Sequence, residues 1–247
     1  MPKEAFVSER PPEIDPQDNL LPSLMVLTFT TGVIDAVSFV GLGHVFTANM
    51  TGNVVFIGFA LAGAQGVSIA RSLVALVAFG GGALLGGRLV SGLARASARH
   101  LALASASEAA SLAIAAGLAL GRMGLPPTSI AYTLITLTAF AMGLRNSIVR
   151  KLGVADVTTT VLTLTITGLA ADSQLAGGHN PRSRRRLISV VTMLGGAFLG
   201  ALLLRKWGFT PPLAVAAVLA GAVAVHVVIA VMTPQGKQSR QSVDLQS

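Results

Sequence analysis

A short polar patch interrupts an apolar stretch near the start of the chain, in the sequence FTANMTGNVVFIG at residues 46–58. Its members are Thr47, Asn49, Thr51 and Asn53, with Gly52 among them. Hydroxyl and amide side chains can hydrogen-bond backbone groups that leave helical geometry, and glycine permits a tight turn. Two interpretations follow. The patch caps a short helix, with Asn49 or Thr51 as the N-cap, or it also coordinates a small solute or ion.

Asp35 is an ionisable residue fifteen positions beyond Leu20, where the first apolar segment begins. A carboxylate inside a membrane helix is costly and is by default a functional hypothesis. Its nearest candidate partners are the polar patch and His44. Asp35 is therefore either a structural group held by hydrogen bonds, or a group that carries a proton or cation.

Glu108 and Arg145 are predicted to form an ion pair. Glu108 lies seven positions into the third apolar segment and Arg145 lies near the inner end of the fourth, which predicts that both are in the cytoplasmic half. Such a pair neutralises two charges that are costly to bury. It is interpreted as a clamp between helices, with an inner gate as the alternative.

Several kinds of chemistry are not predicted. The chain has no cysteine, and its four histidines show no paired spacing, so we expect neither a metal nor a cofactor. The acidic residues and histidines form no pairs of the kind that a hydrolase requires, so we expect no enzyme. The net charge is +8, but the basic residues are scattered and aromatic residues make up 5%, which argues against nucleic acid.

The composition indicates a membrane protein. Hydrophobic residues make up 52% of the 247 residues and charged residues only 11%, whereas soluble domains carry about 25% charged residues. The expected solvent is the lipid bilayer, and the expected location is the bacterial cytoplasmic membrane. Residues 1–19 and 233–247 are predicted to be disordered cytoplasmic tails.

Six segments are long enough to cross the bilayer, which takes about 20 apolar residues. They are Leu20–Leu42, Arg71–Leu93, Leu101–Gly121, Pro127–Val149, Leu187–Leu204 and Phe209–Met232. Two more, Phe46–Ala64 and Val157–Ala171, are shorter or begin with polar residues. With six spans and an internal amino terminus, fourteen of the 18 Lys and Arg residues lie inside; with eight spans, ten do. Because cytoplasmic loops collect basic residues, six spans with both termini cytoplasmic are predicted.

The two halves of the chain resemble each other. GGALLGG at 81–87 matches GGAFLGA at 195–201 at five of seven positions, and Asp35 corresponds to Asn146. Thr51 corresponds to Thr163 after one insertion, within the second polar stretch DVTTTVLTLTITG. The predicted fold is an all-α inverted repeat, residues 20–121 and 126–232, with two re-entrant or broken short helices. Secondary transporters commonly use this architecture.

The run GVIDAVSFVGLGHVFTANMTGNVVFIGFAL closely resembles the signature of the YoaK family, bacterial integral membrane proteins of unknown function. The resemblance rests on the following residues: Asp35, Ser38, Phe39, Phe46, Asn49, Met50, Thr51, Gly52 and Asn53, with Asn146, Thr160 and Thr163 in the second half. The family usually has a glycine where this chain has Leu164. The resemblance implies a multi-span membrane protein and supplies no activity.

The favoured function is a secondary transporter or permease for a small solute, with proton or cation coupling as one interpretation. The predicted path comprises Asp35, Asn49, Thr51, Gly52, Asn53, Asn146, Thr160 and Thr163. The alternative is a channel or a non-transporting membrane scaffold. The solute or ion is unknown, and a homo-oligomer is compatible with the sequence.

Overall fold

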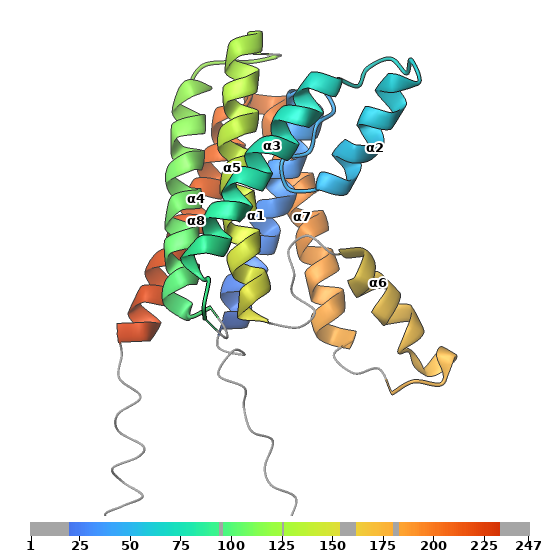
Figure 1. The fold of residues 1–247 in the computed structure, drawn as a ribbon, viewed down its shortest axis with the longest axis vertical. Helices are drawn as coiled ribbons and strands as arrows, with labels where there is room; N and C mark the ends of the chain where they lie inside the picture. Colours follow the sequence, from blue (N-terminus) through green and yellow to red (C-terminus); the bar gives the residue numbers. More distant parts are fainter. Residues whose placement is uncertain (1–19, 94–95, 125, 154–161, 180–182, 233–247) are drawn as a thin grey trace, which may run out of the picture.

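A computed structural model describes residues 20–93, 96–124, 126–153, 162–179 and 183–232 (Figure 1). Within these residues the protein is helical and contains no strand. The elements are α1 (Leu21–Gly41), α2 (Met50–Leu61), α3 (Ile69–Leu89), α4 (Ala98–Leu118), α5 (Thr128–Leu152), α6 (Leu162–Ala171), the short 3-10 helix η2 (Gln174–Ala176), α7 (Ser183–Trp207) and α8 (Thr210–Met232).

Six of these helices, α1, α3, α4, α5, α7 and α8, have 21 to 25 residues. At 1.5 Å per residue this is about 30 Å or more, which matches the hydrocarbon core of a bilayer. They stand side by side as one bundle (Figure 1). Five of them are apolar enough to be candidate membrane spans, and α5 is the exception. Its sequence carries six threonines and serines as well as Arg145, Arg150 and Lys151.

The two remaining α-helices are too short to cross a bilayer, since α2 has 12 residues and α6 has 10. We call the end of the bundle where α1 begins and α8 ends the proximal end, and the opposite end the distal end. Figure 1 shows α2 beside the distal half of the bundle and α6 at its proximal end. The first polar patch thus lies across the start of a half-length helix. Thr47 and Asn49 precede α2, and Thr51 and Asn53 lie in its first turns.

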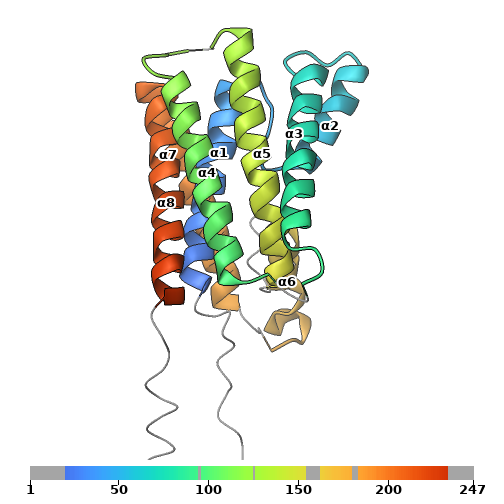
Figure 2. The same ribbon diagram turned by 60° about the vertical axis from the view of Figure 1, so that its left-hand side comes forward.

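The core lies around α1 and α5. Figure 2 shows α5 between α4 and α3, and α5 packs against both of them. In the same way α1 packs against α7 and α8, and α4 packs against α8. Most of α1 is buried, whereas α3 and α7 turn most of their residues outward. In α5 the polar residues Thr138 and Arg145 are buried against other helices, whereas those near its two ends are exposed.

Glycines let two helix pairs approach backbone to backbone. A Cβ atom on Gly82 of α3 would collide with the carbonyl oxygen of Phe140 on α5, and one on Gly196 of α7 would collide with that of Phe29 on α1. Gly82 and Gly196 are 114 positions apart, and Phe29 and Phe140 are 111 apart. The α3–α5 and α7–α1 contacts therefore pair the same residue types, a glycine facing the backbone of a phenylalanine, at similar offsets in the two halves. Small residues commonly let membrane helices approach this closely.

All six predicted long segments are helical, with shifted ends. The largest shifts are at the end of α3, which ends at Leu89 and not at Leu93, and at the start of α7, which begins at Ser183 and not at Leu187. The basic residues Arg184, Arg185 and Arg186 therefore belong to its first turn. The predicted segment began after these arginines because only apolar residues were counted, but arginine is a good helix former.

Candidate functional site

The first polar centre is the connection between α1 and α2, where the chain leaves helical geometry beside other helices. Arg71 donates from Nη1 to the carbonyl oxygen of Leu42 at 2.9 Å. Its guanidinium occupies the space that a Cβ on Gly43 would need, and Gly43 has a positive φ of 82°. Nδ1 of His44 lies 2.8 Å from the carbonyl oxygen of Gly66. These contacts hold the broken backbone in place, as such backbone requires inside a bilayer.

Asn53 binds backbone groups of the connection between α1 and α2 that have no helical partner. Its Nδ2 donates to the carbonyl oxygen of Phe46 at 2.6 Å, and its Oδ1 accepts from the Phe46 amide at 2.9 Å. The side chain is fully buried. The ring of Phe46 stacks between those of Phe39 and Phe56, with centroids 5.0 and 5.7 Å away. For Asn53 the structure therefore gives a structural role, the first of the two interpretations.

Asp35 lies against the amino-terminal end of α2. Its Oδ1 accepts a hydrogen bond from the amide of Ala48 at 3.0 Å, and the amides of Thr47 and Asn49 are adjacent donors. Asn49 occupies the N-cap position, but its own side chain makes no capping bond. These amides belong to the segment that leads into α2, which begins at Met50. The carboxyl group of Asp35 therefore joins α1 to this segment and satisfies its buried backbone.

The other predicted path residues are placed differently. Asn49 and Thr51 are exposed on the outside of the bundle. Gly52 packs against the ring of Phe46, which leaves 2.6 Å for a Cβ atom. Asn146 is partly buried on α5, and Thr163 is exposed on α6. Thr160 lies outside the described residues. Of the set, only Asp35 and Asn53 are buried in the bundle.

Sequence reasoning missed Thr165, the buried polar residue of α6. It lies 112 positions after Asn53, the same offset that relates Thr51 to Thr163. Extending the internal alignment by two residues would have identified it. Close by, Arg186 of α7 forms an ion pair at 2.6 Å with Asp172, just after α6.

The second polar centre is a charged cluster between α1, α4 and α5. Nη1 of Arg145 lies 2.8 Å from Oε1 of Glu108, and both side chains are fully buried. Nη2 of Arg145 donates to Oγ1 of Thr31 at 2.6 Å. Nη1 also reaches the carbonyl oxygen of Leu27 and Oγ1 of Thr30, each at 3.3 Å. Thr30 donates to Oε1 of Glu108 at 3.3 Å. We name Glu108, Arg145, Thr30 and Thr31 the central cluster.

The central cluster lies at mid-depth of the bundle. Glu108 is the eleventh of the 21 residues of α4. Thr30 and Thr31 are the tenth and eleventh of the 21 residues of α1. Arg145 is the eighteenth of the 25 residues of α5, so its backbone lies nearer the proximal end. That the pair lies in the cytoplasmic half stays a prediction.

The buried charges do not balance. Asp35 lies one turn beyond Thr31 on the same face of α1. The region thus contains two buried carboxyl groups, Asp35 and Glu108, and one buried guanidinium, which pairs with Glu108. Oε2 of Glu108 and the hydroxyl of Thr47 are buried and have no hydrogen-bond partner. Because an uncompensated buried charge is costly, this region can accept one positive charge, as a proton or a bound cation.

The described residues contain no group of three histidine, cysteine or acidic side chains that could hold a metal ion. The long apolar helices, the half-length helices and the buried charges together define a helical multi-pass membrane protein. The family model described as "Protein of unknown function (DUF1275)" matches residues 23–226, and the chain belongs to this family.

One relative supports the same assignment. The chain is 37% identical to "UPF0700 transmembrane protein YoaK" of Bacillus subtilis (strain 168) over 151 residues, which are 60% of this chain and 65% of that protein. The match thus spans less than two thirds of the relative. The predicted membership of the YoaK family is confirmed. No solved structure matches the chain.

Proposed function

We propose that the protein is a secondary transporter or permease for a small solute, coupled to a proton or cation. The observation that carries the proposal is the buried carboxyl group of Asp35, which binds the segment leading into a half-length helix and lies in the same region as the Glu108–Arg145 ion pair. Transporter sites of this type form near the midplane, from broken helices. Binding of a cation or proton at Asp35 removes the excess negative charge.

The proposed architecture is six spans in two inverted repeats, with α2 and α6 as half-length counterparts. The matched glycine contacts of α3 with α5 and of α7 with α1 support it. So does the placement of α2 and α6 at different ends of the bundle (Figure 1). The proximal end is proposed to be cytoplasmic, because basic residues then accumulate inside. No enzymatic activity is proposed.

A labelling experiment tests the topology on this cysteine-free chain. Gln65 and Ser91 are exposed in the α2–α3 and α3–α4 connections. With six spans, a Gln65→Cys variant reacts with an impermeant maleimide applied to whole cells, and Ser91→Cys reacts only after the membrane is opened. The reverse pattern of labelling supports eight spans and contradicts the proposal.

Transport is tested with Asp35→Asn in proteoliposomes. Amino acids, sugars and organic cations are applied in turn on solid-supported membranes, with and without an inward proton gradient. For the solute that gives a current, we expect Asp35→Asn to reduce gradient-driven uptake at least tenfold, because an amide neither binds a proton nor balances a cation. Gln65→Ala, at an exposed position outside the predicted path, serves as the control. Unchanged uptake and pH dependence in Asp35→Asn would rule out the coupling role.

A second candidate function is a non-transporting membrane scaffold or a channel. It is favoured by the hydrogen bonds of Asn53. Its side-chain amide already binds the backbone amide and carbonyl groups of Phe46, and it is therefore not directed at a solute. Two cavities are lined by described residues, one between α4 and α8 and the other between α1 and α7. Neither of these two cavities reaches residues 49–53. The scaffold predicts that no solute gives a current in the transport experiment.

A further inference from the structure

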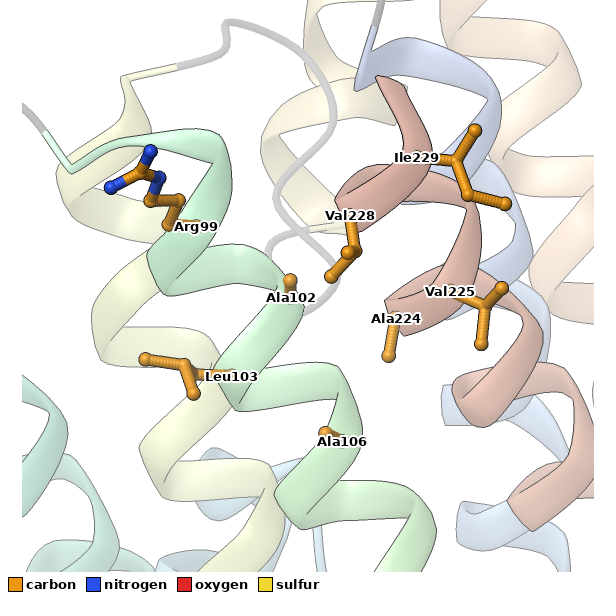
Figure 3. Close-up of a pocket in the computed structure, with 8 residues that line it drawn as sticks. All are labelled: Arg99, Ala102, Leu103, Ala106, Ala224, Val225, Val228 and Ile229. Carbon is orange, nitrogen blue, oxygen red and sulfur yellow. The ribbon is translucent and has the colours of Figure 1, made fainter. Parts of the chain in front are cut away.

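An apolar groove lies between α4 and α8 at the proximal end. The two helices pack closely near Ala109 and Gly221, where a Cβ on the glycine would lie 3.7 Å from the alanine side chain. Toward the proximal end they leave a cavity of about 790 Å³ (Figure 3). The small residues Ala102, Ala106 and Ala224 line it, together with Leu103 and Val228.

The groove opens to the outside of the bundle. Leu103 is 63% exposed and Val225 is 59% exposed, so the walls of the groove face the hydrocarbon. Figure 3 shows Ala102 and Val228 facing each other across the groove. An apolar groove in this position accommodates an acyl chain, because lipid tails fill the space around membrane helices and no buried polar group has to be matched.

Arg99 lies at the proximal end of this groove. It is the second residue of α4 and is exposed, so it lies at headgroup depth when α4 spans the bilayer. The acidic residues in the described part of the chain are Asp35, Glu108 and Asp172, and none of them pairs with Arg99. The amino-terminal end of α4 adds partial positive charge at the same place. The groove thus combines an apolar floor with a cation at its rim that no acidic residue in the described part of the chain compensates.

We propose that the groove between α4 and α8 binds one anionic phospholipid of the proximal leaflet, with its phosphate on Arg99 and an acyl chain along Ala102 and Ala106. The proposal is independent of the transport function. A second apolar cavity at the same end, about 490 Å³ between the starts of α1 and α7, also has an arginine, Arg184, in its lining. Anionic lipids are attracted to basic residues at this depth.

The test compares phosphatidylglycerol with phosphatidylcholine, each added to the purified protein in detergent. Native mass spectrometry counts the bound lipid molecules, and the fluorescence of the single Trp207 follows thermal unfolding. We expect phosphatidylglycerol to bind more tightly and to raise the melting temperature. Arg99→Gln weakens its binding about fivefold, the factor that corresponds to about 1 kcal/mol per basic residue at an anionic surface.

Two matched controls separate the groove from general surface charge. Arg88→Gln removes an exposed arginine at the proximal end of α3, which does not line the groove. It is expected to leave tight binding unchanged. Ala106→Leu fills the groove and is expected to abolish binding, whereas Ala110→Leu, one turn further along α4 and also exposed, does not. Equal binding of both lipids, equal effects of the two arginine variants, or unchanged binding in Ala106→Leu each overturn the proposal.

Discussion

Replacing Arg145 by methionine is expected to lower the free energy of unfolding by about 3–5 kcal/mol, the usual cost of leaving one partner of a buried ion pair alone. The loss arises because Glu108 stays fully buried without its counter-charge. The hydroxyl of Thr31 also loses the hydrogen bond that it accepts from Arg145. The measurement is denaturation by sodium dodecyl sulfate in mixed micelles, followed by far-ultraviolet circular dichroism.

The double variant Glu108→Gln with Arg145→Met separates charge from packing. It removes both charges, so it is expected to recover most of the lost stability. Arg150→Met is the control for removing an arginine from the same helix, because Arg150 is exposed near the end of α5. A double variant as unstable as Arg145→Met alone contradicts the assignment of the loss to the unpaired carboxylate.

The second large effect is expected from adding a single methyl group at Gly82 or at Gly196. Either alanine substitution places Cβ against a backbone carbonyl oxygen of the facing helix, Phe140 or Phe29. Backbone atoms do not move aside as the end of a flexible side chain does, so the helices must separate. We expect a loss of about 3 kcal/mol, the upper part of the range for overpacking, for each variant in the same denaturation experiment.

Gly80→Ala is the matched control, because it lies on α3 and a Cβ there meets no atom within 4 Å. This substitution is expected to be neutral or slightly stabilising, since alanine has the higher helix propensity. Similar losses for Gly82→Ala and Gly196→Ala agree with the proposed repeat. A loss for only one of them contradicts the equivalence of the two helix pairs.

The sequence predicted the helices well because length and hydropathy are local properties. One of the two predicted N-cap positions, Asn49, is the N-cap of α2. The polar patch was also expected to be the nearest partner of Asp35, and the carboxyl group of Asp35 accepts a hydrogen bond from the amide of Ala48 within this stretch. The pattern of residues 46–58 contains no information about which backbone amide a side chain of another helix binds.

The central cluster was predicted in part. Opposite charges identified Glu108 and Arg145, because so few charges occur in the apolar segments. Thr30 and Thr31 were missed. A threonine in a helix commonly bonds to its own preceding turn, and both residues do so with Leu27. Only the fold, which places α1 beside Arg145 of α5, shows that their hydroxyl groups also accept hydrogen bonds from the guanidinium.

The position of Arg145 along the chain bears on how the protein is made. An arginine at the centre of a membrane helix costs about 2.5–3.5 kcal/mol during insertion, and α5 is the long helix that fails the criteria for a candidate span. All the described groups that bind the Arg145 side chain, Leu27, Thr30, Thr31 and Glu108, precede it in the sequence. During synthesis the receiving surface on α1 and α4 therefore leaves the ribosome first, and α5 enters a bilayer that already contains its counter-charge.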